Sequence, residues 1–216
     1  MKRSNSLAVK AGASKISSLG EFEELLSPGR GINSRISQAL EDLPKNSAVL
    51  FIVGLKDYST VLAELLRILQ ARKQQGDGAY LTVNKPVEDL AKAFSRNKIS
   101  TGSVFFIDAI SILSGRKASS GKKAMFLDSP TDLIDMDNAI SKQLSKSQKP
   151  GFVVFDSLST LLLYNKPQAV EKFLHVLVGK IRGANVQVFL ITVKSSEHAG
   201  LIETVSQFVD KVVEIS

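Results

Sequence analysis

The sequence predicts an α/β protein whose central sheet is mostly parallel and is covered by helices on both faces. The main observation is that short apolar runs, bounded by turn residues, alternate with segments of helical periodicity along most of the chain. A second observation is that no apolar run approaches the roughly 18 residues needed to span a bilayer. A third is the 44% hydrophobic content of 216 residues, which suffices for one substantial core. We therefore expect a soluble protein that makes no membrane contact.

The apolar runs and the helical stripes between them define the expected elements. Strands are predicted at 47–54, 78–83, 103–110, 151–156, 186–193 and 211–216. Helices are predicted at 59–73, from Pro86, from Thr131 or Asp132, and at 167–182. In the first of these helices, one apolar stripe is formed by Leu62, Leu65, Leu66 and Leu69. One predicted helix therefore lies between each pair of consecutive strands from the first to the fifth, as in parallel sheets.

Composition and charge exclude some chemistry and favour one class of partner. Cysteine is absent, which excludes disulfides, thiolate zinc sites and cysteine nucleophiles and fits a reducing, cytoplasmic location. The 28 Lys and Arg residues exceed the 21 Asp and Glu residues, for a formal net charge of +7. This excess favours anionic partners without identifying one.

The first 18 residues differ from the remainder of the chain. The segment "MKRSNSLAVKAGASK" is basic and rich in small residues, and it contains no apolar stretch long enough for a secretory signal. We expect residues 1–18 to form a flexible basic tail, with a targeting role or a basic arm that touches a partner as the alternatives. Residues 19–216 are expected to form a single domain.

The turn after the first predicted strand, "GLKDYST", begins at Gly54 where a phosphate-binding loop would lie. Such a loop, G-x-x-x-x-G-K-[ST], uses glycines to curl amides around phosphates, a lysine to neutralise them and a hydroxyl to reach magnesium. When the following helix is superposed, Ser59 takes the place of the hydroxyl, Tyr58 that of the lysine and Asp57 that of the last glycine. The turn is also about one residue short.

Each of these differences opposes the binding of a triphosphate. Asp57 would set a carboxylate against the phosphates, and the missing glycine removes the backbone freedom that an anion nest requires. Lys56 is the nearby cation, and it is either solvated or a partial substitute from another direction. Ser59 has a simpler interpretation as the N-cap of the helix.

Asp156 and Ser157 follow the apolar strand 151–156. In a P-loop NTPase this is the Walker B position, where an aspartate helps to hold magnesium. The alternative is that Asp156 or Ser157 caps the following helix, and Ser157 lacks the G-x-S-x-G elbow of a hydrolase. Asp108, at the end of the strand 103–110, has the same two interpretations.

From about Asn46 to the C-terminus, the chain resembles the RecA superfamily and, within it, the KaiC-like ATPases. The segments that carry the resemblance are 54–60, "AYLTVNKPVEDL" at 79–90, "VVFDSLSTL" at 153–161 and "VSQFVDKVVEIS" at 205–216. The resemblance implies a RecA-like P-loop NTPase fold in which the strand 186–193 separates the strand that ends at Val53 from the Walker B-like strand. It also implies a glutamate pair, one member of which prepares the attacking water, where an overlay without gaps places Asn84 and Lys85.

Two departures in one catalytic assembly predict a pseudo-ATPase, because phosphoryl transfer depends almost entirely on positioning and electrostatic stabilisation. We expect no use of ATP or magnesium and no metal site. A retained core without its phosphate cradle favours the hypothesis of a RecA/KaiC-like domain that acts through protein contacts, as a regulatory or signalling scaffold. Its expected partner is an active RecA/KaiC-like ATPase or a second copy of itself in an oligomer.

Two alternatives remain open. One is nucleic-acid binding through a basic loop at 114–124, whose cations are Arg116, Lys117, Lys122 and Lys123, although no aromatic residues interleave with them. Lys142, Lys146, Lys149 and Lys194 could add phosphate contacts. The other is a weak nucleotide sensor or residual ATPase with an atypical pocket built from Ser59, Thr60, Asp156 and Lys194.

Overall fold

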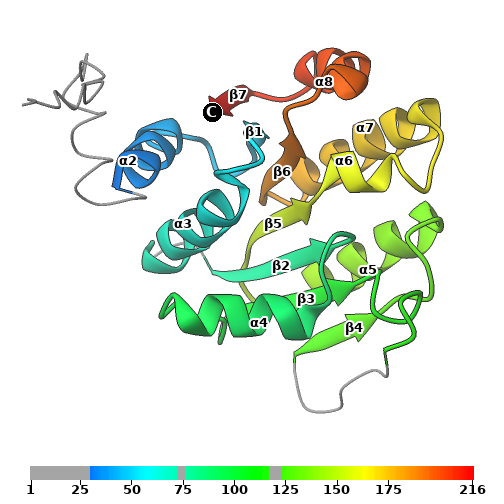
Figure 1. The fold of residues 1–216 in the computed structure, drawn as a ribbon. Helices are drawn as coiled ribbons and strands as arrows, with labels where there is room; N and C mark the ends of the chain where they lie inside the picture. Colours follow the sequence, from blue (N-terminus) through cyan, green and yellow to red (C-terminus); the bar gives the residue numbers. More distant parts are fainter. Residues whose placement is uncertain (1–29, 73–75, 117–122) are drawn as a thin grey trace, which may run out of the picture.

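The computed structural model describes residues 30–72, 76–116 and 123–216, and these form one parallel sheet with helices on both faces (Figure 1). The seven strands of the described residues lie in the order β4-β3-β2-β5-β6-β1-β7. Their bounds are β1 Ala48–Val53, β2 Asp77–Thr82, β3 Val104–Asp108, β4 Ala124–Phe126, β5 Pro150–Asp156, β6 Gln187–Val193 and β7 Lys211–Ile215. The predicted α/β class is confirmed.

All six predicted strands are confirmed, each to within two residues at either end. The adjacency implied by the resemblance is also confirmed, because β6 pairs with β1 on one side and with β5 on the other. Strand β4 was not predicted, and its first residue, Ala124, falls within the predicted basic loop. Its three residues are all half-buried, so they are too few and too mixed in exposure to give an apolar period.

The helices are α2 Arg30–Ala39, α3 Tyr58–Ala71, α4 Val87–Arg96, α5 Leu133–Lys146, α6 Leu158–Leu161, α7 Pro167–Gly183 and α8 Ala199–Ser206, with a 3₁₀ turn, η1, at Ser196–His198. The four predicted helices are confirmed as α3, α4, α5 and α7. Helix α2 was missed because its sequence, RGINSRISQA, is mostly polar and buries few apolar side chains. Helices α6 and α8 are short, so neither offers enough turns for a clear period.

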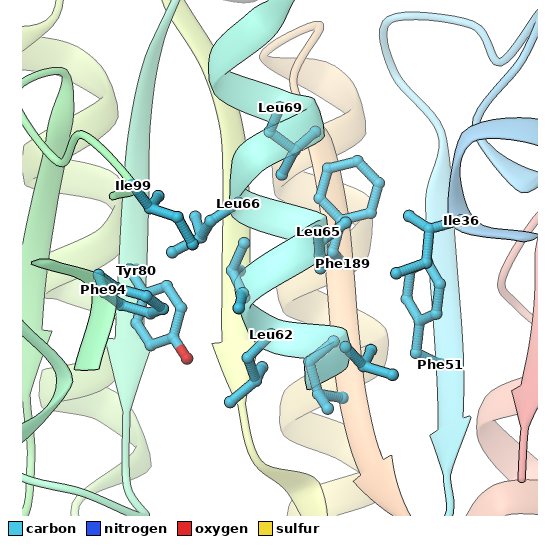
Figure 2. Packing of buried hydrophobic residues seen from close by; sticks show 14 of the residues in the cluster. Ile36, Phe51, Leu62, Leu65, Leu66, Leu69, Tyr80, Phe94, Ile99 and Phe189 are labelled. Atoms are coloured by element: carbon cyan, nitrogen blue, oxygen red, sulfur yellow. The ribbon is translucent and has the colours of Figure 1, made fainter. Parts of the chain in front are cut away.

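Two apolar clusters cover the two faces of the sheet. One lies under α2, α3 and α4, and the other lies under α5, α6, α7 and α8. Strand β1 is buried along its whole length and contributes alternate side chains to both clusters, which explains its unbroken apolar sequence. Figure 2 shows the predicted leucine stripe of α3 packed over Phe51 and Phe189, with Tyr80 beside Phe94.

Two predictions, the flexible tail and the start of the domain, concern residues that the structure does not describe. The predicted tail, residues 1–18, and the start of the predicted domain at residue 19 precede the first described residue, Arg30. Within the described ranges, no helix combines the length and the apolar character required to cross a bilayer.

Candidate functional site

The predicted site residues come from the connections that follow β1, β2 and β5. Because the strands are parallel, these connections meet at the carboxyl edge of the sheet, where open α/β sheets usually bind ligands. The structure brings Tyr58, Asn84 and Asp156 into a chain of hydrogen bonds. It also adds Tyr80, which was not predicted to belong to the site.

The connection after β1 is a tight turn. The Asp57 amide donates to the Gly54 carbonyl at 3.0 Å, and the Gly54 amide donates to the Ile215 carbonyl of β7 at 2.7 Å. A Cβ added at Gly54 would lie 3.3 Å from the Cα of Ser216 and 3.5 Å from a carboxylate oxygen of Asp57. The turn therefore closes on itself and against the end of β7, and the Gly54 and Asp57 amides are used within the protein.

The first residues of α3 correct one prediction. The helix begins at Tyr58 and its N-cap position is Asp57, which makes no side-chain capping bond. Ser59, expected as the N-cap, instead lies in the first helical turn with an exposed side chain. Thr60 is half-buried beside it, and Lys56 is exposed. The N-cap preference for serine therefore did not decide this boundary, and Tyr58, the first helical residue, is buried.

Asp156 lies at the centre of the site, at the end of β5, and its side chain is fully buried. Its Oδ1 accepts a hydrogen bond from the Tyr58 hydroxyl, and its Oδ2 accepts one from the Tyr80 hydroxyl at 2.6 Å. The Asn84 side-chain amide donates to the Tyr58 hydroxyl oxygen at 3.2 Å. We call Tyr58, Tyr80, Asn84 and Asp156 the tyrosine–aspartate cluster.

The electrostatics of this cluster follow from burial. Burial raises the pKa of Asp156, and the hydrogen bonds from Tyr58 and Tyr80 and the charge of exposed Lys85 oppose that rise. Burial and the neighbouring Asp156 carboxylate raise the pKa of both Tyr58 and Tyr80 well above the usual value for a phenol. Both tyrosines are therefore neutral hydrogen-bond donors at physiological pH.

The connection after β2 places Asn84 and Lys85 differently. The Thr82 hydroxyl donates to the Lys85 carbonyl at 2.7 Å and accepts from the Lys85 amide at 3.2 Å, which closes the turn. This turn aims the Asn84 side chain at Tyr58 and leaves the Lys85 side chain exposed. Only Asn84 of this pair joins the cluster through a hydrogen bond.

Asp108 and Ser157 both have structural roles. The buried Asp108 carboxylate accepts from the amides of Val87, Ile110 and Ser111, at 2.7, 3.0 and 2.8 Å, and from the Ser111 hydroxyl at 2.7 Å. It thereby fixes the start of α4 to the turn that follows β3. Ser157 is the N-cap of α6, and its hydroxyl accepts from the Thr160 amide at 3.3 Å. The capping alternative is confirmed for Ser157.

The cations predicted to contact nucleic acid are partly engaged within the protein. Arg116 forms an ion pair with Asp89 at 2.8 Å, and the Lys123 ammonium donates to the Gly102 carbonyl at 2.8 Å. Lys117 and Lys122 lie outside the described residues. Lys194, named for both alternatives, forms an ion pair with Glu214.

Across the described ranges, no group of three or more His, Cys, Asp or Glu side chains is arranged to hold a metal ion. Asp156 is the carboxylate at the position implied for magnesium, and both of its oxygens accept from tyrosines. The absence of an ATP or magnesium cofactor stays a prediction.

Solved structures share this architecture. The uncharacterized protein PH0321 from Pyrococcus horikoshii, determined in complex with an unknown peptide, has a TM-score of 0.57 and 11% identity, over 84% of this chain and 82% of that chain. The KaiC-like protein PH0186 from Pyrococcus horikoshii OT3 has a TM-score of 0.49 and 14% identity, over 70% of this chain and 63% of that chain. The chain thus spans less than two thirds of PH0186. By its strand order, the protein is of the α/β class with a parallel sheet, and it shares this fold with PH0321.

Residues 60–215 match the family described as "Family of unknown function (DUF7504)", and because this match covers most of the chain, the protein belongs to that family. No match is found among curated proteins.

Proposed function

We propose that this protein is a catalytically inactive RecA/KaiC-like domain that works through protein contacts, as a regulatory or signalling scaffold. The observation that carries the proposal is the hydrogen bond from Tyr58 to Asp156. In the overlay, Tyr58 stands where a phosphate-binding lysine would be and Asp156 stands where the magnesium carboxylate would be. The two residues bind one another, so a ligand would have to separate them.

The energetics of that separation favour the closed arrangement. Asp156, Tyr58 and Tyr80 are all buried, and each oxygen of the carboxylate has a phenol donor. Leaving one buried polar group without its partner costs about 1–3 kcal/mol, and more when the group is charged. A nucleotide at this edge would have to supply that free energy before it gained any affinity.

The position implied for the catalytic glutamate supports the same conclusion. Asn84 donates its side-chain amide to Tyr58 and cannot accept a proton from an attacking water. Lys85 is exposed and cationic, so it is no general base in this place. The cluster therefore supplies neither a free metal ligand nor a carboxylate base.

An edge of the sheet supports the protein-contact part of the proposal. Among the described strands, β7 pairs only with β1, so its other edge has no strand partner. A groove of about 360 Å³ lies between this edge and α2 and is lined by Arg35, Gln38, Ala39 and Lys211–Glu214. Val212 is 42% exposed there. The Glu214 carbonyl of β7 accepts from Arg35 at 2.6 Å, and the remainder of this edge beside the groove can accept an added strand from a partner. PH0321, which has a similar fold, was determined with an unknown peptide.

Calorimetric titration with Mg-ATP tests the catalytic half of the proposal. We expect no binding heat in the micromolar range and no phosphate release. Asp156→Asn and the exposed-carboxylate control Asp128→Asn should behave like the wild type. Micromolar binding with turnover, abolished by Asp156→Asn and retained by Asp128→Asn, would overturn the assignment.

Co-purification of the tagged full chain from its native cells tests the contact half. Val212→Lys places a charge on the open edge of β7, and Val176→Lys makes the same change at a 53% exposed valine on α7. We expect a protein partner to be retained by the wild type and by Val176→Lys and to be lost from Val212→Lys. Equal retention by both variants would contradict a contact at β7.

A further inference from the structure

The opposite edge of the sheet, where the strands begin, contains a cavity of about 620 Å³. Three cations line it: Lys45 from the segment before β1, Arg72 from the end of α3 and Lys149 from the segment before β5. The other described residues that line the cavity are neutral. We call this space the amino-edge cavity.

The charges of these cations are not compensated by carboxylates. None of the three forms an ion pair with a described residue. The Arg72 guanidinium donates to the Leu40 carbonyl at 2.7 Å, which holds it in place without neutralising it, and partial burial lowers its pKa. The carboxylate of nearby Asp77 does not line the cavity and accepts from the Ser147 hydroxyl at 2.8 Å. The cavity is therefore a region of positive potential.

An apolar groove continues from this cavity. It has a volume of about 340 Å³ and runs between α5 and α7, where Leu144 is half-buried and the side chains of Ile140, Leu177 and Ile181 line it from the buried core. Pro150 and Ala184 line both the cavity and the groove, so the two spaces adjoin. Lys180 at the groove is already paired with Asp137. The groove thus adds an apolar surface to a cationic one.

We propose that the amino-edge cavity and the α5–α7 groove form one binding site for an amphipathic phosphate monoester. Its phosphate would contact Lys45, Arg72 and Lys149, and its apolar chain would lie along the groove. Three uncompensated cations favour a phosphate monoester, which carries nearly two negative charges at neutral pH, over a singly charged carboxylate. The volumes fall in the range of small-molecule sites, about 300–1,000 Å³.

Neither the amino-edge cavity nor the α5–α7 groove would by itself indicate an amphipathic phosphate monoester. A bare anion would leave the apolar groove unexplained, and a neutral apolar molecule would leave the three cations without a counter-charge. The site is also separate from the tyrosine–aspartate cluster. Strand β5 begins in the cavity at Pro150 and ends in the cluster at Asp156, and seven strand residues span about 20 Å.

Titration of the ¹⁵N-labelled full chain with dodecyl phosphate, below its micelle concentration, tests the proposal. We expect saturable micromolar binding, with amide shifts at Gly151 and Ala184 on the cavity wall and none at Asn84 or Ser157 on the carboxyl edge. Inorganic phosphate, dodecyl maltoside and dodecanoate should each bind at least about tenfold more weakly. Shifts confined to the carboxyl edge, or equal binding of dodecanoate, would overturn the site or its headgroup.

Variants that remove equal charge distinguish binding of dodecyl phosphate at this site from non-specific attraction of an anion to a basic protein. Lys45→Gln with Lys149→Gln should weaken dodecyl phosphate at least about tenfold, whereas Lys92→Gln with Lys142→Gln removes the same charge from exposed positions outside the cavity and should leave binding unchanged. Leu144→Gln should weaken dodecyl phosphate while leaving inorganic phosphate unaffected. Equal losses in the two lysine pairs would contradict a defined site. Thermal unfolding of each variant checks that the fold is retained.

Discussion

The two edges of the sheet treat charge in opposite ways. At the carboxyl edge, the polar groups of the tyrosine–aspartate cluster bind one another and are buried. At the amino edge, Lys45, Arg72 and Lys149 surround an open cavity without carboxylate partners among the described residues. Parallel α/β sheets usually bind ligands at the carboxyl edge. Here the polar groups of the cluster satisfy one another, and three cations gathered around one cavity lie at the other end of the same strands.

The comparison also shows why a shared fold does not carry a shared activity. The strand order has the adjacency of β1, β6 and β5 that the sequence resemblance implied, whereas the groups that contact Asp156 are phenols from α3 and β2. A fold places side chains at an edge, and the chemistry depends on which side chains these are. Four measurements test this contrast between the two edges.

The largest expected effect is that of Asp156→Ala. This change removes a buried carboxylate and leaves two buried tyrosine hydroxyls without their acceptor. We expect the free energy of unfolding to fall by about 3 kcal/mol or more. Urea denaturation measures it, and Asp128→Ala, at an exposed loop carboxylate, should change stability by less than about 0.5 kcal/mol. Similar effects for both variants would show that the cluster does not stabilise the fold.

Removing a single donor should have a smaller effect. Tyr80→Phe keeps the ring packed against Phe94 and Phe106 but leaves one carboxylate oxygen of Asp156 unsatisfied. We expect a loss of about 1–3 kcal/mol in the free energy of unfolding. Tyr164→Phe serves as the control, because Tyr164 is half-buried and makes no side-chain hydrogen bond with a described residue. A loss no larger than that of the control would remove Tyr80 from the cluster.

The pH dependence of stability tests the raised pKa of Asp156. Because its folded pKa lies above its unfolded value, near 3.9, its favourable contribution is fully present below that value and is lost as pH rises through the folded pKa. Asp156→Asn cannot titrate, so its stability relative to wild type should rise with pH above about 4. The slope should be at most about 1.4 kcal/mol per pH unit. Denaturation at several pH values measures this difference, and a falling difference would contradict the raised pKa.

The smallest expected effect is at the amino edge. Lys149→Gln removes one of three uncompensated cations around the cavity and should raise the free energy of unfolding by up to about 0.5 kcal/mol at low salt. Arg182→Gln offers the contrast, because it breaks the ion pair with Asp210 at 2.8 Å and should lower stability by about 0.2–1 kcal/mol. Denaturation at low and high salt compares them. Effects of the same sign would show that the cavity cations are not under repulsion.

The site was only partly predictable from the sequence. Tyr58, Asn84 and Asp156 were identified because their positions after strands could be compared with a known pattern. Tyr80 was missed because it lies in the middle of β2, where the sequence pattern indicates only an aromatic residue of the core. The available signal was its hydroxyl, since a tyrosine buried in a central strand needs a hydrogen-bond acceptor nearby. The amino-edge cavity was missed because its cations come from three connections far apart in the chain.

The alternation of strands and helices could be predicted from the sequence alone, because short apolar runs and 3.6-residue stripes report burial directly. The sequence also determined which side chains end β1, β2 and β5, and hence which residues meet at the carboxyl edge. The folded structure was needed to find that Tyr58 and Tyr80 both bind Asp156, and that Lys45, Arg72 and Lys149 line one cavity. The physical reason is that periodicity records whether a residue is buried, whereas its partner depends on the packing of segments distant in sequence.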